Sequence, residues 1–184
     1  MKQLYMFAIM PPPELAVRIN SERLLFSEKY KCVKALKPPV HITLYPPFHD
    51  TNDFEEKIKG IQRWVEEQTG FFIELMDFNF FKKHNSPVVY IGVVKNDNLN
   101  KLHEGFLEQL KNYIPVKSSG SYTPHFTIGY RDVPSAIFPN IVKEYSTRRF
   151  SASFEVSSIY LWKHDGKNWQ ILNEYKFGTA TQLI

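Results

Sequence analysis

The sequence has almost no cysteine and no long apolar run. Cys32 is the single cysteine among 184 residues, so the chain can form no internal disulfide and no zinc site built on several cysteines. No apolar stretch approaches the roughly 20 residues that a membrane-spanning helix needs. The apolar run before Pro11 is also too short for the core of a signal peptide. We therefore expect a cytoplasmic protein with no membrane segment.

Neither sign of charge dominates the composition. The chain carries 23 Lys and Arg against 19 Asp and Glu, a net charge of +4, which is compatible with an anionic ligand but does not require one. The hydrophobic fraction of 43% and the aromatic fraction of 15% are ample for a buried core, which argues against a disordered chain.

Apolar periodicity and turn residues predict strands that alternate with helices. The predicted strands cover 4–10, 40–45, 71–81, 88–94, 122–130, 154–162 and 169–177. The predicted helices begin at 13 or 14, run from 51 or 52 to the glycine at 70, and cover 98–113 and 134–145. In the first helix, Leu15, Ile19, Leu24 and Leu25 are expected to face the core. The strand at 40–45 is expected to end at the two prolines that follow it.

A shift of 84 residues superposes this order of elements on itself. The strand at 4–10 then falls on 88–94, the first helix falls on 98–113, and the strand at 71–81 falls on 155–165. The residues themselves scarcely match, so the element order repeats and the sequence does not. We expect two similar lobes, 1–84 and 85–177, related by an approximate twofold axis within a single domain.

A His-x-Thr pattern occurs once in each predicted lobe, as His41-Ile42-Thr43 and His125-Phe126-Thr127. Residues i and i+2 of a strand lie on one face, so each copy presents an imidazole beside a hydroxyl. One such copy would most simply be a histidine satisfied by the backbone within the core. Two copies in matching strands favour a shared site.

Two imidazoles and two hydroxyls suit phosphoester chemistry without a metal. Histidine titrates near neutral pH, so one ring can accept a proton from an attacking water or hydroxyl while the other gives a proton to the leaving oxygen. The hydroxyls of Thr43 and Thr127 can hold the non-bridging phosphate oxygens, on which charge builds up in the transition state. The candidate catalytic residues are therefore His41, Thr43, His125 and Thr127.

Three further residues are candidates for substrate binding. Arg131 is in phase with His125 and Thr127 along a continued strand, and it is either a phosphate ligand or a solvated strand-end charge. The same phase points Tyr45 into the groove, and Phe48 lies just beyond. These two rings either stack on a nucleobase or pack in the interior.

Other charged residues support weaker alternatives. A metal could bind both histidines together with Asp50, Asp53 or Asp132, but the sequence lacks a helical His-x-x-x-His pair and a carboxylate cluster, so we predict no metal and no cofactor. The pairs Lys83-His84 and Lys163-His164 are either exposed turns or a faint basic rim for a polyanion.

The doubled motif resembles the two-histidine phosphoesterase superfamily, which includes the 2′-5′ RNA ligase-like proteins and the 2′,3′-cyclic nucleotide phosphodiesterases. The residues that carry the resemblance are HITL at 41–44 and HFTI at 125–128. Looser similarity lies in LYMFAIMPP at 4–12, FNFFKKHNSPVVYIGV at 78–93 and VSSIYLWKHDGKNWQILNEYKF at 156–177. Many ligase-like members have an arginine closely after the second motif. Here Tyr130 intervenes, and Arg131 is the candidate for that role.

The resemblance implies a bilobal α+β fold in which two antiparallel sheets line a central cleft and helices lie outside. It also implies metal-independent opening of a nucleoside or RNA-terminal 2′,3′-cyclic phosphate to a 2′-phosphate, and for some members the reverse joining of RNA ends. The partner would be an RNA end or a small cyclic nucleotide, and the protein would be a monomer. The alternative function is a non-catalytic binder of RNA ends or nucleotide phosphates that uses the same cleft.

Overall fold

The computed structural model describes residues 2–82, 87–116 and 121–178. The strands of this part of the chain are β1 (Lys2–Ile9), β2 (Ile42–Thr51), β3 (Phe71–Phe81), β4 (Val88–Val93), β5 (His125–Gly129), β6 (Ser151–Val156), β7 (Ser158–His164) and β8 (Trp169–Lys176). Its helices are α1 (Pro13–Tyr30), the short 3-10 helix η1 (Lys34–Leu36), α2 (Phe54–Lys57), α3 (Ile61–Glu66), α4 (Asp97–Leu110) and α5 (Phe138–Tyr145). None of the described helices combines the length and apolar character needed to cross a membrane.

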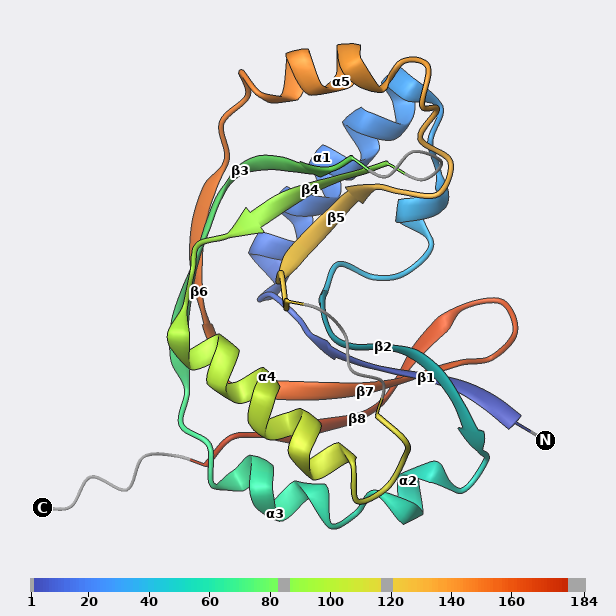
Figure 1. The fold of residues 1–184 in the computed structure, drawn as a ribbon, viewed down its shortest axis with the longest axis vertical. Helices are drawn as coiled ribbons and strands as arrows, with labels where there is room; N and C mark the ends of the chain where they lie inside the picture. Colours follow the sequence, from blue (N-terminus) through green and yellow to red (C-terminus); the bar gives the residue numbers. More distant parts are fainter. Residues whose placement is uncertain (1, 83–86, 117–120, 179–184) are drawn as a thin grey trace, which may run out of the picture.

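The structure confirms the predicted α+β class, with antiparallel strand pairs throughout (Figure 1). The strands form one eight-stranded sheet in the order β6-β3-β4-β5-β2-β1-β7-β8. The expected two separate sheets are therefore joined edge to edge. At the junction of β2 and β5, the register among described residues consists of the single pair Ile42 and Phe126.

The strand order is symmetrical about this junction in the way that the predicted repeat requires. β2 and β5 flank the junction, β1 and β4 come next on either side, and β7 and β3 follow them. These are the strands that the shift of 84 residues superposes. The repeat and its two lobes stay a prediction, since this order supports them without measuring a superposition.

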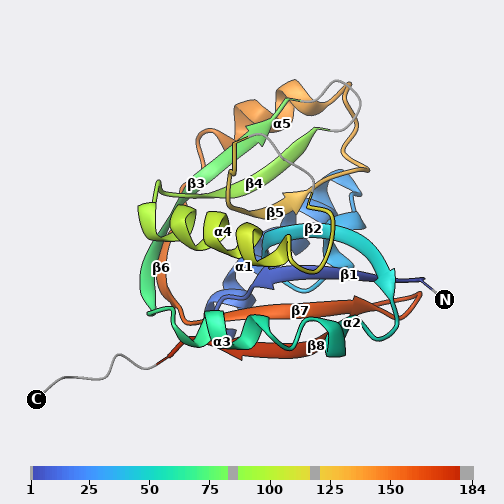
Figure 2. The same cartoon turned by 60° about the horizontal axis from the view of Figure 1, so that its bottom comes forward.

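Each long helix packs on strands of the opposite half of the sheet. α1, from the first half of the chain, contacts β5, and α4, from the second half, places Phe106 against Phe7 of β1 with ring centroids 4.8 Å apart. Figure 1 shows α1 behind β4 and β5, and Figure 2 shows α4 above α3. The halves therefore share one hydrophobic core.

The buried face of α1 differs from the prediction. Leu15 and Ile19 are buried as expected, but the exposed fractions of Leu24 and Leu25 are 44% and 50%. Helical spacing continues instead from Ile19 to Arg23 (i+4) and Phe26 (i+7), and these two side chains are buried. A charged residue therefore occupies a core position of this helix.

Strand β2 continues to Thr51 through Pro46 and Pro47, where the sequence predicts an end. A proline lacks the N–H that a central strand needs on both sides. Beyond Ile42, β2 pairs with β1 on one side but has no register partner on β5 among the described residues. The open side of the strand tolerates the two prolines.

Two other predicted elements are divided in the structure. The second predicted helix is split into α2 and α3 around Gly60, a residue with low helix propensity. The predicted strand 154–162 is interrupted at Ser157, because the chain changes partner there. β6 pairs with β3, whereas β7 pairs with β1 in the other half of the sheet.

Close packing of α1 on β5 depends on Gly129. A Cβ atom at this position would overlap the ring of Phe26, which is fully buried. We therefore expect Gly129→Ala to destabilise the protein by about 1–3 kcal/mol through overpacking, measured by urea denaturation. Gly70→Ala is the matched control, because its added methyl would meet the flexible end of the Glu155 side chain. Equal losses of stability in the two variants would contradict this account.

Candidate active site

A cavity of about 300 Å³ lies where the two halves of the sheet meet, and both motifs line it. Its walls include all four predicted catalytic side chains, His41, Thr43, His125 and Thr127. The apolar residues between them, Ile42 and Phe126, lie in the hydrophobic core. Ile42 lies on the core side of its strand, whereas Phe126 is buried in the core and also borders the cavity.

The register at the junction sets the relative positions of the motifs. Ile42 pairs with Phe126 in an antiparallel sense. Continuing that register by one residue in each direction sets His41 opposite Thr127 and Thr43 opposite His125. The two histidines are then diagonal neighbours on one face, a relation that corresponds to about 7–8 Å between backbone positions.

Each histidine is oriented by the backbone just before its strand. Nδ1 of His41 lies 2.8 Å from the carbonyl oxygen of Pro39, and Nδ1 of His125 lies 2.7 Å from that of Thr123. A carbonyl oxygen only accepts hydrogen bonds, so Nδ1 carries the hydrogen in both rings. Nε2 is then the nitrogen that can take up or release a proton, and both copies use the same device at the same spacing of two residues.

A matching irregularity follows both threonines. On β2, Thr43 pairs with Ala8 and Tyr45 pairs with Phe7, so Leu44 is an extra residue. On β5, Thr127 pairs with Tyr90 and Gly129 with Val89, so Ile128 is extra in the same way. Each bulge reverses the face on which the next residues lie. Leu44 and Ile128 are both buried in the core.

The strand phase that points Tyr45 into the groove is wrong because of this bulge, and both Tyr45 and Phe48 follow the alternative of packing in the interior. Tyr45 shares the face of Phe7 and packs against Phe48 in the hydrophobic core, with ring centroids 5.5 Å apart. Phe48 also stacks on Phe7 and contacts Phe54. Neither ring is part of the cavity wall. The same reversal turns Gly129 toward Phe26 on the core side.

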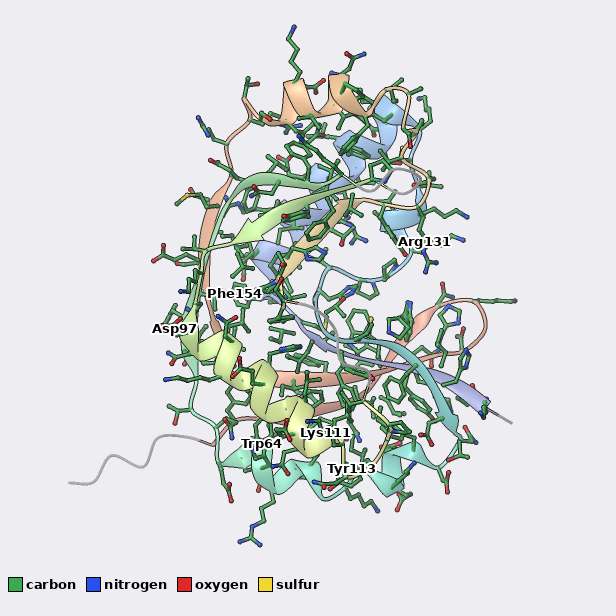
Figure 3. All side chains as sticks on the ribbon, in the orientation of Figure 1. Trp64, Asp97, Lys111, Tyr113, Arg131 and Phe154 are labelled. Atoms are coloured by element: carbon green, nitrogen blue, oxygen red, sulfur yellow. The ribbon has the colours of Figure 1, made fainter. Side chains whose placement is uncertain are left out.

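Arg131 does line the cavity, although it reaches it from a loop. β5 ends at Gly129, and Arg131 adopts a left-handed backbone conformation with φ of 66°. Its guanidinium lies 5.3 Å from the centroid of the Tyr130 ring, and its side chain is exposed. Figure 3 shows it beyond the end of β5, beside η1. The prediction that Arg131 lies on a continued strand is therefore wrong, but Arg131 does lie at the cavity, as predicted.

The structure also reports on the weaker alternatives. The carboxylate of Asp132 accepts hydrogen bonds from the backbone N–H groups of Val33 and Lys34, and Asp50 is bonded to Thr51 and Lys57. Within residues 2–82, 87–116 and 121–178, no group of three His, Cys, Asp or Glu side chains is arranged to hold a metal ion. Of the suggested basic rim, Lys83-His84 lies outside the described residues, and Lys163-His164 is not part of the cavity wall.

Aromatic rings flank both histidines. His41 lies 4.9 Å from Trp162, and His125 lies 5.1 Å from Phe81 and 4.8 Å from Tyr90, measured between ring centroids. These rings keep water from one side of each imidazole, and desolvation disfavours a charged ring.

This desolvation lowers the pKa of both histidines. The pKa of His41 falls from 6.5 to about 4, chiefly through desolvation, which outweighs the opposing effect of the Pro39 hydrogen bond. The positive charges of Arg23 and His125 lower it further. Desolvation also lowers the pKa of His125. Desolvation thus favours the neutral form of both rings.

Arg23 is a cavity residue that the sequence analysis did not identify. It lies on α1, its side chain is 4% exposed, and it reaches the same wall as His41. The signal was available, because Arg23 falls between Ile19 and Phe26 on the apolar stripe of the helix. The neighbouring Leu24 and Leu25 instead predicted an apolar stripe that excludes Arg23.

Comparison with known proteins gives a consistent result. A model of the 2′-5′ RNA ligase superfamily matches residues 11–168 of the chain. Among curated proteins, the chain is 26% identical over 184 residues to one from Geobacillus sp. (strain WCH70), covering 97% of this chain and 98% of that protein. It is 28% identical over 176 residues to one from Geobacillus kaustophilus (strain HTA426), covering 95% and 96%. The names of both describe candidate phosphoesterases.

Solved structures with the same fold cover nearly the whole chain. The crystal structure of E. coli LigT complexed with 3′-AMP matches with a TM-score of 0.70 at 19% identity, covering 96% of this chain and 99% of that one. The crystal structure of TT0787 of Thermus thermophilus matches with a TM-score of 0.68 at 16% identity, covering 95% and 97%. At these identities the likeness shows the fold.

Because the pKa of His41 is lowered in the folded protein, the free energy of unfolding should depend on pH. Between pH 6.5 and about 4 the unfolded chain binds a proton that the folded ring does not, so stability falls as the pH falls through this range. We expect the wild type to lose about 2 kcal/mol more than His41→Gln between pH 7 and pH 5 in urea denaturation. His49→Gln, an exposed position on the same strand, should keep the wild-type pH dependence. Parallel curves for the wild type and His41→Gln would refute the prediction.

Proposed function

The chain belongs to the 2′-5′ RNA ligase superfamily, and we propose that it opens a nucleoside or RNA-terminal 2′,3′-cyclic phosphate to a 2′-phosphate without a metal. The observation that carries this proposal is the arrangement of the two histidines. Both rings have Nδ1 bonded to a carbonyl and Nε2 left for proton transfer, and both line one cavity.

The reaction follows from two proton transfers. One histidine, neutral at Nε2, takes a proton from water while the water oxygen forms a bond to phosphorus. The bond from phosphorus to O3′ breaks, and the other histidine, protonated at Nε2, gives its proton to O3′. The products are a 2′-phosphate and a 3′-hydroxyl. Positions on opposite sides of the phosphate suit this in-line displacement.

The remaining polar groups of the wall fit the same reaction. The hydroxyls of Thr43 and Thr127, each beside a histidine of the opposite strand, can donate hydrogen bonds to the non-bridging oxygens. Arg131, at the exposed edge, can contact a phosphate or the continuing RNA chain. Phosphate binding also brings negative charge near both imidazoles. That charge raises their pKa values, so one of them can be protonated in the complex.

A nucleotide substrate is supported by the size of the cavity and by the relatives. About 300 Å³ is at the lower end of the range of small-molecule pockets. Crystal structures of E. coli LigT include complexes with 3′-AMP, phosphate, ATP and NADP+. If the hydroxyl of a second RNA end replaces water as the nucleophile, the same proton transfers join the ends by a 2′-5′ bond. One chain supplies both motifs, so the reaction needs no second subunit.

A non-catalytic binder of RNA ends or nucleotide phosphates is the second candidate. The neutral rings argue against it, because arginine or lysine attracts phosphate more strongly than a neutral imidazole does. The paired orientation of the Nε2 atoms favours catalysis. Binding alone would not require the same tautomer in both rings.

Activity of histidine variants separates these functions. In the presence of EDTA, we expect release of a 2′-phosphate from a nucleoside 2′,3′-cyclic phosphate, and a loss of about 10²- to 10⁴-fold in kcat for His41→Ala and for His125→Ala. The exposed His49, on the same strand as the first motif, supplies the control His49→Ala, which should retain full activity. Full activity in either catalytic variant would refute the mechanism. Tight binding by the wild type without turnover would favour the binder.

The lowered pKa values predict an acidic optimum for kcat/KM. This parameter reports the protonation states of the free enzyme, in which both histidines have pKa values below their ordinary value. We expect kcat/KM to peak below pH 6.5, and kcat to peak at a higher pH because bound phosphate favours the charged ring. Initial rates between about pH 4 and pH 8 measure both profiles. A kcat/KM that rises from neutral to alkaline pH would rule out this pair as acid and base.

A further inference from the structure

Arg23 is a buried cation without a counter-charge. Among the residues that the structure describes, Nη2 of its guanidinium donates a hydrogen bond to the carbonyl oxygen of Pro38 at 2.8 Å, and its Nε has no partner. Among the ion pairs of the described residues, none involves Arg23. Leaving a charge buried and unpaired is costly, so such an arrangement persists where a ligand completes it or where function requires it.

The location of this charge points to a ligand in the cavity. Arg23 lies in the wall that also holds both His-Thr pairs. Burial lowers the pKa of Arg23 to about 10, so the side chain is still positively charged at neutral pH. His41 lines the same cavity, and the positive charge of Arg23 lowers the pKa of its ring. An anion held between the histidines would therefore lie within the field of Arg23.

Two other charged residues lie near Arg23 in the fold. Asp132 accepts hydrogen bonds through Oδ2 from the backbone N–H groups of Val33 and Lys34, while its Oδ1 is buried without a partner; within the described residues it forms no ion pair with Arg23. Arg131 is exposed and lies over Tyr130. Arg23 is therefore the cation at the cavity that is shielded from water, where an electrostatic interaction is strongest.

We propose that Arg23 is an anion-binding residue of this site and that the phosphate of the substrate is its counter-charge. The identity of the anion as a phosphoester depends on the proposed function, whereas the anion site itself does not. A fixed cation in a desolvated wall favours the extra negative charge that develops on phosphate oxygens in the transition state. Arg23 would thus contribute to binding and to the chemical step.

A purely structural role is the rival explanation. Nη2 of Arg23 holds the carbonyl of Pro38, and the next carbonyl along the chain, that of Pro39, orients His41. On this view Arg23 only fixes the segment before the motif. The helix offers a matched control for it, because Arg18 also donates from Nη2 to a backbone carbonyl, that of Ser151 at 3.0 Å, but is exposed and outside the cavity.

The test compares the binding of inorganic phosphate to the wild type and to three variants, Arg23→Met, Arg23→Lys and Arg18→Met. Binding is measured by titration calorimetry and by thermal unfolding with and without phosphate. We expect Arg23→Met to bind phosphate on the order of 10- to 100-fold more weakly and to lose most of the rise in Tm that phosphate causes. Arg23→Lys, which keeps the charge, should retain part of the affinity, and Arg18→Met should retain all of it. Phosphate affinity in Arg23→Met within twofold of the wild type would overturn the proposal.

A measurement on the wild type covers the case in which Arg23→Met does not fold. The guanidinium ¹⁵N–¹H resonances of Arg23 should shift as phosphate is added, and those of Arg18 should not. Resonances of Arg23 that stay unchanged at saturating phosphate would reject the anion site. If phosphate binding depends on Arg23 but no cyclic phosphate is hydrolysed, the proposed function fails and this inference stands. If the wild type hydrolyses a cyclic phosphate but Arg23→Met binds phosphate as tightly as the wild type, the proposed function stands and this inference fails.

Discussion

The pairing of Ile42 with Phe126 is the contact on which the arrangement of the cavity depends. It is the register pair that joins β2 to β5, and both side chains are almost completely buried in the common core. Burying side chains of this size contributes roughly 1.5–3 kcal/mol each, which secures the junction although the ladder there is short. Because each residue stands between a histidine and a threonine, the same contact fixes all four polar side chains on the opposite face. In each motif, the apolar residue thus stabilises the junction of β2 and β5, while the histidine and the threonine on either side of it line the cavity.

The crossed packing of the long helices supports this junction from behind. α1 lies against β5 and brings Arg23 to the cavity wall, while α4 lies against β1 through Phe106 and Phe7. A helix from each half therefore braces a strand from the other half. The two motifs cannot separate without exposing apolar surface on both sides, so the cavity is held at a fixed width. The two proton transfers proposed for this site require such rigidity.

The sequence predicts this site well up to each threonine and poorly beyond it. Alternation correctly assigns His41, Thr43, His125 and Thr127 to one face, because both strands are regular there. The bulges at Leu44 and Ile128 involve buried apolar residues that look like any strand residue, so the reversal of faces at Tyr45 and Gly129 has no local signal. Arg23 had a signal in its spacing from Ile19 and Phe26, but adjacent leucines suggested another helix phase. The α+β class and the order of helices and strands along the chain follow from local sequence patterns. The joining of the strands into one sheet depends on contacts between residues far apart in the chain.

The switch of strand partner at Ser157 has a consequence for how the protein is made. β1 is among the first segments to be synthesised, yet it pairs with β7, where Leu4 meets His164. Nearly the whole chain separates these partners, so the half of the sheet that carries the first motif cannot be completed until most of the chain has left the ribosome. Until then β1, with its buried face of Tyr5, Phe7 and Ile9, has an unpaired edge. The nascent chain therefore passes through an aggregation-prone stage that a chaperone would be expected to shield.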